Sequence, residues 1–565
     1  DFLGLKTLTS IQYCIDSLGD LATFDWMNLP LDDANTFALL NQGKTLGVFQ
    51  LESSGMQDLA RNLHLDKFEE IIAIVSLYRP GPMDMIPSFI ARKLGREEIE
   101  NDHPWLEEIL SETYGIMVYQ EQVMQIASKM ADFSLAQGDV LRRAMGKKDA
   151  AEMAQQRLLF VEGAQAKGVS EPVATKVFNK MEKFAAYGFN KSHAAAYGYI
   201  AYVTGFLKAN FPSQWLAALM TCDRDDIAKV SKFIAEAKSM GIAILPPDVN
   251  SSGEYFTPTN EGIRFSLGAI KGVGRGISQE IVLERNRGGP FKDFYDFVQR
   301  LYEKKMSKKV VECLIDAGGF DFTTWSRDAL VLSIEPVFSR VAQKNSEDSK
   351  GFMNLFDALS VNEQSEFSSA PQVPSPRSSA QIYLREKELL GFFLTGNPLE
   401  SYNSEIINTH CNSLDAIDAI DGEGVLRLAF IIDEIAVKTS QRTGKKFAIL
   451  KISDGTFRFE LPVWPEMYDE NAHNLKENSI FLAVVSVENK TGLKLSCRWL
   501  QPIDEYSTST SQKCDEAFDK AKEMQSWQKR ERKPKKEQTE NERTTEENVT
   551  LQLSLIHISE PTRRS

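Results

Sequence analysis

Phe184-Ala185-Ala186-Tyr187-Gly188-Phe189-Asn190-Lys191-Ser192-His193-Ala194-Ala195-Ala196-Tyr197 is the stretch that predicts most about this chain. Asn190 is a favoured N-cap, and the alanine-rich sequence after it predicts a helix from Lys191 to the stop at Phe211-Pro212. Lys191 and His193 then lie in the first turn, where a cation costs about 0.3–1 kcal/mol. Because helix N-termini bind anions readily, we interpret the segment as a site for a charged ligand.

The aromatic residues of the same stretch extend this interpretation. Tyr187 and Phe189 flank Gly188, where their rings could stack on a base or a sugar. The alternative is that these rings pack in a core and that the Lys-Ser-His turn is merely solvated.

A second basic segment, Leu141-Arg142-Arg143-Ala144-Met145-Gly146-Lys147-Lys148, lies about forty residues upstream. We expect Arg142 and Arg143 near the C-terminus of a helix that Gly146 closes. Cations there can simply complement the helix dipole. Four cations in seven residues exceed what capping needs, which favours an anionic ligand.

The composition of the 565 residues, with a formal net charge of −14, argues against a protein that coats nucleic acid with its whole surface. Cations concentrated in a channel remain compatible with that charge, because binding depends on the local field. The cysteines are widely spaced, which predicts reduced thiols and neither a disulfide framework nor a zinc site. No apolar run is long enough to cross a bilayer, and no signal peptide is visible.

The two ends look unnatural. The chain starts at Asp1 without a methionine, so we expect residues upstream to be missing. Residues 553–565 resemble the translation of a sequencing adapter, and we exclude them as an artefact.

Helical periodicity dominates residues 5–250, which predicts an α-rich domain. A second unit of short helices and glycine turns follows over residues 262–320. Its stretch Ala269-Ile270-Lys271-Gly272-Val273-Gly274-Arg275-Gly276-Ile277 fits a helix-hairpin-helix, in which glycine amides donate to a DNA phosphate without sequence preference. A plain glycine-rich turn is the alternative. The polar residues 343–350 and 365–381 are typical of linkers.

Strand periodicity begins near residue 424. We predict strands at 425–437, 447–452, 457–463, 480–487 and 493–497, with a short helix at 466–475 between the third and fourth. That order is typical of an OB-fold, whose first loop, here with Arg442, Lys445 and Lys446, grips single strands. OB domains also bind proteins or sugars. Residues 515–550 predict a charged, mobile or partly helical tail, and a nucleic-acid arm is the less favoured interpretation.

These features together resemble the alpha subunits of bacterial DNA polymerase III, the C-family replicative polymerases. The motifs that carry the resemblance are Asp1-Phe2-Leu3-Gly4-Leu5-Lys6-Thr7-Leu8-Thr9, Val48-Phe49-Gln50-Leu51-Glu52-Ser53, Tyr78-Arg79-Pro80-Gly81-Pro82, Tyr119-Gln120-Glu121-Gln122-Val123-Met124, the two basic segments, and Leu390-Gly391-Phe392-Phe393-Leu394-Thr395-Gly396-Asn397-Pro398.

The resemblance implies a DNA-directed DNA polymerase that adds dNTPs to a primer 3′ end. In this family three carboxylates hold two Mg²⁺ ions for in-line phosphoryl transfer. Asp1 would be the third carboxylate, both catalytic residue and metal ligand. The first two lie in an upstream aspartate pair, so we expect a C-terminal fragment that lacks the N-terminal phosphoesterase-like domain, the thumb and most of the palm. We expect this fragment to be inactive alone.

The resemblance also implies the binding residues. The nucleotide site would use Arg142, Arg143, Lys147, Tyr187, Asn190, Lys191 and His193. The DNA sites would use Lys271, Gly272, Gly274, Arg275 and Gly276 for the duplex and Arg442, Lys445 and Lys446 near the template strand. Leu355 and Phe356, in Phe352-Met353-Asn354-Leu355-Phe356, match a sliding-clamp peptide that has lost its usual glutamine.

The predicted fold class is therefore multidomain: a mainly α fingers domain, a helix-hairpin-helix unit, a β-barrel OB-fold and a charged tail. The expected boundaries are 1–15 for the end of the palm, 16–255 for the fingers, 256–400 for the helix-hairpin-helix and clamp-binding region, 424–503 for the OB-fold and 504–552 for the tail. The expected partners are primer-template DNA, dNTPs, the sliding clamp, a proofreading exonuclease and the clamp loader, in the cytoplasm and with no membrane.

Two other interpretations stay open. One is a non-catalytic adaptor built from helix-hairpin-helix and OB modules, which needs no triphosphate site. The other is an error-prone paralogue of the same polymerase family, which the missing front half would distinguish.

Overall fold

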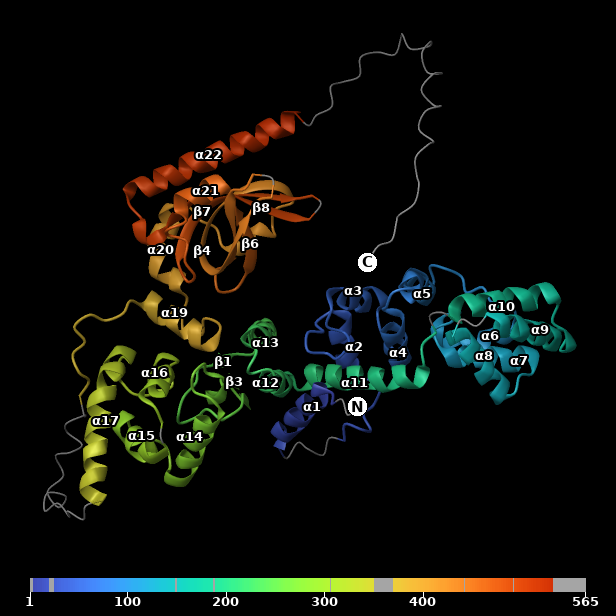
Figure 1. The fold of residues 1–565 in the computed structure, drawn as a ribbon, viewed down its shortest axis with the longest axis horizontal. Helices are drawn as coiled ribbons and strands as arrows, with labels where there is room; N and C mark the ends of the chain where they lie inside the picture. Colours follow the sequence, from blue (N-terminus) through green and yellow to red (C-terminus); the bar gives the residue numbers. More distant parts are fainter. Residues whose placement is uncertain are drawn as a thin grey trace, which may run out of the picture. The chain divides into compact units, whose positions relative to one another are not determined.

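The computed structural model describes residues 4–19, 25–147, 150–185, 188–304, 306–349, 369–441, 443–490 and 492–531. By contacts the chain divides into two compact units, Asp1–Ser401 and Tyr402–Ser565 (Figure 1). No helix among the described residues combines the length and the apolar character that a membrane span requires.

The first unit begins with an array of helices. They are α1 (Lys6–Ser17), α2 (Ala34–Asn41), α3 (Ser54–Leu63), α4 (Phe68–Leu77), η2 (Pro82–Met85), α5 (Ile86–Lys93), α6 (Trp105–Leu110), η3 (Ser111–Thr113), α7 (Gln120–Ala131), α8 (Leu135–Lys147), α9 (Ala150–Ala166), α10 (Glu171–Ala185), α11 (Lys191–Asn210), α12 (Pro212–Cys222) and α13 (Ile227–Ser239). The helix predicted from Lys191 to Phe211-Pro212 is therefore present as α11.

Helix α11 is the central element of this array and packs against α2, α4 and α12 (Figure 1). Its alanine and glycine positions let neighbouring backbones approach closely. At Gly198, for example, an added Cβ would lie only 3.0 Å from Ile72 Cγ1. Val203 and Leu207 enter one hydrophobic core, whereas Ala201 and Tyr202 enter another. A helix that is apolar around most of its circumference is a buried one, and α11 joins the two cores.

Lys208 is the fully buried cation of α11. Its ammonium group donates to the carbonyl oxygens of Lys44 and Leu46, both at 2.7 Å, and to a Glu236 carboxylate oxygen at 2.5 Å. Burial lowers the pKa of Lys208, and the Glu236 carboxylate opposes that shift. Because a buried charge is tolerated only when it is fully paired, these bonds fix α11 to α13 and to the 44–46 loop.

A separate core lies under α6 to α10. Its largest buried side chains include Phe160 and Phe178, whose ring centroids are 5.5 Å apart. Gly163 permits the tight crossing of α7 and α9, because a Cβ there would lie 2.3 Å from the Ala131 carbonyl oxygen.

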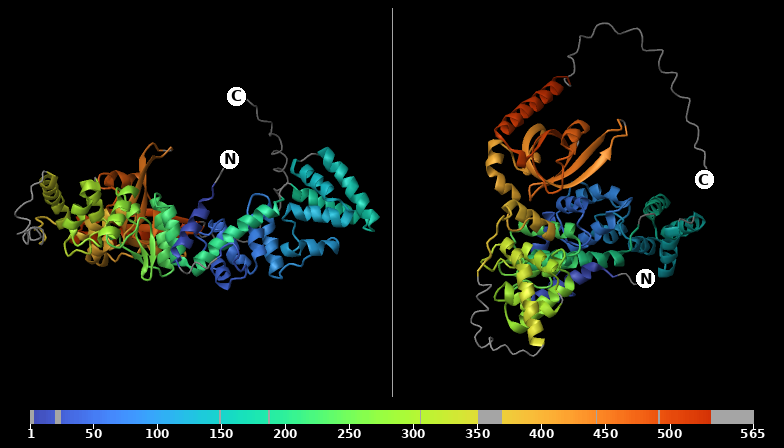
Figure 2. Two further views of the ribbon diagram at one scale, coloured as in Figure 1. Left: turned by 90° about the horizontal axis from the view of Figure 1, so that it is seen from below. Right: turned by 60° about the vertical axis from the view of Figure 1, so that its left-hand side comes forward.

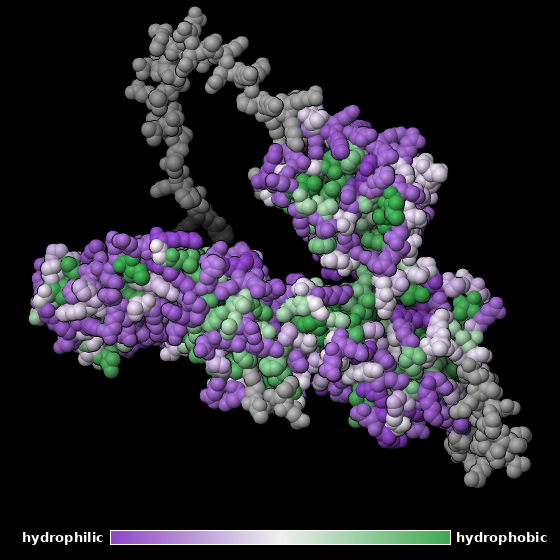
Figure 3. Space-filling view, turned by 180° about the vertical axis from the view of Figure 1, so that it is seen from behind, coloured by the Kyte–Doolittle hydropathy of each residue, from purple (hydrophilic) through white to green (hydrophobic). Residues whose placement is uncertain are grey.

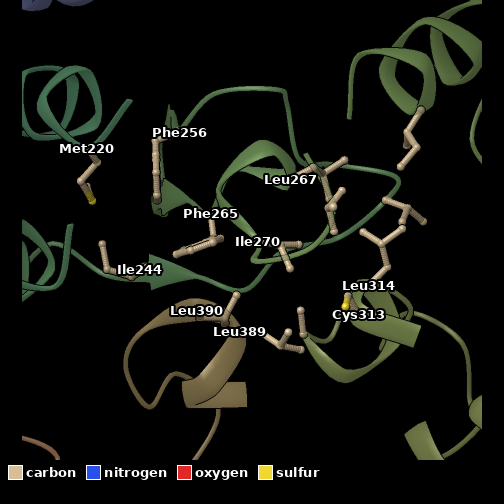
Figure 4. Packing of buried hydrophobic residues seen from close by; sticks show 14 of the residues in the cluster. Met220, Ile244, Phe256, Phe265, Leu267, Ile270, Cys313, Leu314, Leu389 and Leu390 are labelled. Atoms are coloured by element: carbon tan, nitrogen blue, oxygen red, sulfur yellow. The ribbon is translucent and has the colours of Figure 1, made fainter. Parts of the chain in front are cut away.

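The rest of the first unit combines small strands with further helices. These elements are β1 (Ile244–Leu245), β2 (Thr257–Thr259), β3 (Gly262–Arg264), η4 (Leu267–Ala269), α14 (Arg275–Gly288), α15 (Phe294–Leu301), η5 (Tyr302–Lys304), α16 (Lys308–Asp316), α17 (Arg327–Ser349), α19 (Ser379–Leu390) and η6 (Pro398–Tyr402). The strand order is β1-β3-β2. Figure 4 shows that Phe265, Ile270, Leu314 and Leu389 converge on one core, from the residue after β3, the turn between η4 and α14, α16 and α19.

Two sequence expectations for this region are wrong. The short three-stranded sheet was missed, because two- and three-residue strands carry almost no periodicity. Residues 343–349, expected to be linker, continue α17 to Ser349. A helix already anchored by buried Leu330, Val337 and Val341 can extend through polar residues at little cost.

The second unit is a five-stranded antiparallel sheet with order β6-β5-β4-β7-β8. Its elements are α20 (Asn403–Asn408), η7 (Leu414–Ile417), β4 (Gly422–Thr439), β5 (Lys446–Ser453), β6 (Arg458–Val463), α21 (Pro465–Asn471), β7 (Ile480–Asn489), β8 (Leu493–Pro502), η8 (Ile503–Glu505) and α22 (Thr508–Glu531). The end of β4 pairs with β5 alone, so these two strands project as an arm (Figure 2).

The predicted fold class, a helical region, a helix-hairpin-helix and then a β domain, is confirmed. The hydrogen-bonded sheet is open, with β6 and β8 at its edges, rather than a fully closed barrel. Its strand order, with α21 between the third and fourth strands, is OB-like. The boundaries proposed from the sequence stay predictions.

The start of the expected tail forms α22, which packs on β4, β7 and β8. Cys514 and Ala521 of α22 are buried against Val425 and Val484 of the sheet. Arg427 of β4 reinforces this contact by donating to Asp515 at 2.6 Å and by lying 3.9 Å above the Phe518 ring. The face shown in Figure 3 is mostly hydrophilic, with separate apolar patches.

We predict that Lys208→Ala destabilises the first unit by about 3–5 kcal/mol, because it leaves Glu236 and two carbonyl groups without their donor. Urea denaturation followed by tryptophan fluorescence measures the change, since Trp215 is fully buried in the same core. The matched control is Lys229→Ala, which removes a lysine whose side chain is 55% exposed and should change stability little. Equal effects of the two substitutions would contradict the role of Lys208.

Candidate functional site

The N-terminus of α11 is held in place by the segment before α7. Phe189 N–H donates to the Val118 carbonyl at 3.2 Å, and Gln120 N–H donates to the Phe189 carbonyl at 2.8 Å. The Gln120 side chain also donates to the Gly188 carbonyl at 3.0 Å. A Cβ at Gly188 would lie 3.0 Å from the Phe184 ring and 3.1 Å from Gln120 Cγ, so only glycine fits there without displacement.

Five side chains form a continuous series at this end of α11, which we call the ring ladder: Arg79, Phe189, His193, Tyr197 and Phe49. The Arg79 guanidinium lies 4.3 Å above the Phe189 ring. Ring centroids are then 5.7 Å apart for Phe189 and His193, 4.4 Å for His193 and Tyr197, and 5.3 Å for Tyr197 and Phe49. The four-residue spacing of His193 and Tyr197 places them on one face of α11, and Phe189 lies just before the helix.

The ring ladder is accessible. His193 is exposed, and the other four members are half-buried. Burial lowers the pKa of the Arg79 guanidinium from its usual range, although arginine remains charged at neutral pH. Stacked rings that end in a guanidinium can bind a planar base next to an anionic group.

The sequence singled out only part of the ring ladder. His193 was named as a candidate and Phe189 as a ring that could stack on a base or a sugar, whereas Tyr187 lies outside the described residues. Arg79, Phe49 and Tyr197 were missed as site residues, although all three lie in motifs quoted for the family resemblance. Their spacing could not reveal the site, because Arg79 and Phe49 come from loops far from α11 in the chain.

The helix N-terminus itself is occupied by the protein's own carboxylates. Asn190 caps α11 by accepting from His193 N–H at 2.8 Å, as predicted. The Glu121 carboxylate accepts from Asn190 Nδ2 and from Lys191 N–H, both at 2.9 Å. The Lys191 ammonium pairs with Glu112 at 2.7 Å. The cation in the first turn is therefore balanced internally, and the argument that it requires a bound anion does not hold.

These carboxylates also affect Tyr119, which lies under the Lys191 ammonium at 5.4 Å from the ring centroid. Burial raises the pKa of Tyr119, and the negative charges of Glu112 and Glu121 raise it further. Tyr119 is thus a neutral, structural support at neutral pH.

The other basic segment lies on α8. Arg142 and Arg143 both pair with Asp139, at 2.8 and 3.1 Å, and their side chains are 37% and 58% exposed. Helix α8 runs through Gly146 to Lys147, so Gly146 does not close it as expected. Among the described residues no hydrogen bond, ion pair or ring contact connects either arginine with the ring ladder. The Lys147 side chain lies outside the described part of the chain.

The glycine hairpin before α14 has the geometry of a phosphate-binding turn. Gly272 and Gly274 have φ values of 92° and 73°, in the region that favours glycine. A Cβ would meet nothing within 4 Å at Gly274 or Gly276, whereas at Gly272 it would lie 3.0 Å from Cys313 Sγ of α16. The hairpin thus rests on α16 through Gly272 and presents an open N-terminus of α14.

Two of the predicted DNA contacts in this hairpin already have partners. The Lys271 N–H donates to the Leu389 carbonyl of α19 at 3.0 Å. The Arg275 guanidinium donates to Glu254 at 2.6 Å and to the Tyr255 hydroxyl at 3.1 Å, and the Glu254 hydrogen bond raises the pKa of Arg275. The side chain of Lys271 remains exposed.

A second turn of similar form follows α16, but it is enclosed. Gly318 has a φ of 93°, and the Gly319 N–H donates to the Leu314 carbonyl at 2.8 Å. Arg327, at the start of α17, pairs with Asp321 and with the fully buried Glu386 of α19. This turn is structural, which leaves the first hairpin as the candidate phosphate contact.

The loop between β4 and β5 carries the last group of predicted residues. Lys445 and Lys446 are exposed, and the loop is closed by bonds from Ser440 N–H to the Lys445 carbonyl and from Gly444 N–H to the Ser440 carbonyl. Arg442 lies outside the described residues, as do Asp1, Leu355 and Phe356. Within the described ranges, no three His, Cys, Asp or Glu side chains come together so that they could hold a metal ion.

These folds define a class: a helical array followed by a helix-hairpin-helix unit and an OB-like sheet. The family model "Bacterial DNA polymerase III alpha subunit finger domain" matches residues 7–168, and the model "Helix-hairpin-helix motif" matches residues 241–330. The chain belongs to the bacterial DNA polymerase III alpha-subunit family.

Named relatives support this membership. The chain is 50% identical over 526 residues to "DNA polymerase III subunit alpha" of Chlamydia pneumoniae. The matched region covers 92% of this chain and 42% of the relative. Proteins of the same name from Thermus aquaticus and Escherichia coli O157:H7 are 40% and 39% identical, over 89% of this chain and 42% and 45% of their own lengths. The chain thus spans less than half the length of these relatives.

We predict that Asn190→Ala destabilises the N-terminal turn of α11 by about 1 kcal/mol, because it removes the cap of the His193 N–H. Hydrogen exchange of the first-turn amides measures the loss. Asn190→Ser keeps a capping oxygen and should retain most of the protection. Ser192→Ala is the matched control, since the exposed Ser192 hydroxyl has no hydrogen-bond partner among the described residues. Unchanged exchange in Asn190→Ala would show that Glu121 alone holds the turn.

Proposed function

We propose that this chain supplies the nucleotide- and DNA-binding parts of a replicative DNA-directed DNA polymerase. In the full-length protein these parts would serve the addition of dNTPs to a primer 3′ end. The proposal rests on membership of the family and on one structural observation, the ring ladder. Three segments distant in sequence meet there to form an accessible aromatic surface that ends in a guanidinium.

In this proposal the ring ladder contacts the base or sugar of the incoming nucleotide. Arg142 and Arg143 neutralise its triphosphate, and Lys147 and Tyr187 belong to the same site. Asp139 holds both arginines at one helix face while leaving their guanidinium groups partly exposed. Asn190 and Lys191 act as positioning residues, since their bonds to Glu121 and Glu112 fix the first turn of α11.

The glycine hairpin is proposed to bind the sugar-phosphate backbone of the duplex. The amides at the start of α14 would donate to a phosphate, and the exposed Lys271 side chain would add a charge contact. The exposed Lys445 and Lys446, with Arg442, would lie near the template strand.

Two Mg²⁺ ions are proposed for the full-length enzyme, with Asp1 as the one ligand assigned to this chain. The side chains proposed above to bind the nucleotide and the DNA act through stacking, charge and hydrogen bonds, and none of these roles requires a metal. A single carboxylate cannot hold two metals, so we propose that the chain alone does not polymerise. The sliding clamp, through Leu355 and Phe356, the proofreading exonuclease and the clamp loader are proposed partners, and the cytoplasm is the proposed location.

We predict that Lys271→Gln weakens primer-template binding and lowers the magnitude of the salt slope, log K against log[salt], by about 0.9 for one lost phosphate contact. Gly276→Ala should weaken binding without unfolding, because its added Cβ enters open space beside the proposed phosphate. Fluorescence anisotropy at several salt concentrations measures both effects. Lys292→Gln is the matched control, since Lys292 is exposed in the same unit but follows the far end of α14. Equal slopes for the two lysine variants would refute the proposed contact.

We predict that the double substitution Arg142→Ala with Arg143→Ala weakens dNTP binding by roughly 10- to 100-fold, as expected for the loss of charge-assisted bonds. Equilibrium titration of the chain with a dNTP measures the loss. Arg61→Ala is the matched control, because Arg61 makes the same kind of local pair, with Asp58 at 2.5 Å on α3. Unchanged dNTP binding in the double variant would favour a non-catalytic adaptor that uses only the helix-hairpin-helix and OB modules.

A further inference from the structure

A groove of about 570 Å³ lies in the second unit between α22 and the edge of the sheet. Its walls come from the start of α21, from β8 and from one face of α22. The residues that line it are Trp464, Glu466, Met467, Cys497, Arg498, Trp499, Lys513, Glu516, Ala517, Lys520, Ala521 and Met524. This volume is in the range of small-molecule sites.

Trp464 is an oriented and accessible aromatic residue at this groove. Its side chain is 50% exposed, yet its indole N–H donates to Ser496 Oγ of β8 at 3.3 Å. The ring also stacks on Phe447, with centroids 5.5 Å apart and an interplanar angle of 31°. A large ring that is held in place but half exposed can accept a further ring at low entropic cost.

Three cations, Arg498, Lys513 and Lys520, line the same groove. Arg498 is fixed by a hydrogen bond from its Nε to Ser486 Oγ at 2.9 Å. Lys513 and Lys520 are seven residues apart on α22, so they lie on the same helix face, two turns from each other. Among the described residues none of these three cations is paired with a carboxylate. Glu466 and Glu516 also line the groove, so three positive and two negative side chains give its lining a small net positive charge.

The groove is continuous with the arm formed by β4 and β5. Phe447 of β5 is paired with Lys438 of β4, and the next residue, Ala448, is paired with Val463, which precedes Trp464. Lys438, Phe447 and Trp464 therefore form one row across the same face of the sheet. The row leads from the exposed Lys445 and Lys446 of the arm to the groove.

We propose that this groove binds one nucleotide of a single-stranded DNA, with its base on Trp464 and its flanking phosphates on Arg498, Lys513 and Lys520. Stacking requires a base whose face is free, which a single strand offers and a duplex does not. The net positive lining favours phosphates, while the absence of a paired carboxylate on each cation leaves its charge available. The inference rests on the proposed function and adds a site outside the predicted β4–β5 loop.

The test measures binding of a fluorescein-labelled oligothymidylate to the full chain by anisotropy. Trp464→Ala should weaken binding by roughly 5- to 100-fold, the range for loss of one stacked base, and Trp464→Phe should restore most of it. Lys520→Gln should lower the magnitude of the salt slope by about 0.7. Lys522→Gln is the matched control on the same helix, because Lys522 lies over Phe518 rather than in the groove.

A second readout locates the contact. An oligonucleotide that carries 5-iododeoxyuridine should crosslink to Trp464, as identified by mass spectrometry, and Lys513→Gln with Lys520→Gln should reduce the yield. The proposed site is overturned if Trp464→Ala leaves single-strand binding unchanged. It is also overturned if the groove binds an acidic peptide that contains phenylalanine and does not bind the oligonucleotide. If primer-template binding still depends on Lys271, the proposed function survives that result. Failure of the chain to bind any DNA overturns both.

Discussion

The burial of one ammonium group, that of Lys208, is the constraint on which the first unit depends. Its bonds to two carbonyl groups and to Glu236 satisfy a charge that has no access to water. These bonds anchor the C-terminal half of α11 between two hydrophobic cores. Because an α-helix is stiff over its length, anchoring one end fixes the direction of the other, where Asn190, His193 and Tyr197 lie. The precision of the ring ladder thus comes from packing more than ten residues away.

The hairpin before α14 is also held in place by contacts with residues distant in sequence. Gly272 lies against Cys313, and the Leu389 carbonyl takes up the Lys271 N–H, so α16 and α19 hold the turn from behind. Helix α19 is itself fixed by the buried Glu386, which accepts from Arg327 at 3.1 Å and from Leu394 and Thr395 N–H, both at 2.8 Å. Residues 390–398, which carry part of the family resemblance, are therefore part of the support of the hairpin.

Much of this architecture could be predicted from the sequence, because it depends on local patterns such as helix caps, helix stops and alternating apolar residues. Asn190 and Phe211-Pro212 bound α11 as expected, and all five strands of the second unit lie where alternation placed them. The ring ladder could not be predicted as a unit, since Phe49 and Arg79 reach it only through tertiary packing. The anion argument at Lys191 was wrong for a related reason: Glu112 and Glu121, from 70–79 residues upstream, supply the negative charge. Local charge patterns do not reveal partners that are distant in sequence.

The N-termini of α11 and α14 show how an acidic protein can restrict where anions bind. At α11 the site is filled, because Glu121 accepts from the first-turn amide and Asn190 caps another. At α14 the Gly274 and Gly276 positions are open, and no carboxylate caps the turn within the described residues. A net charge of −14 would repel a polyanion from most of the surface. Contact is then favoured only where amides or unpaired cations are exposed, so the negative charge of the rest of the chain contributes to selecting the site.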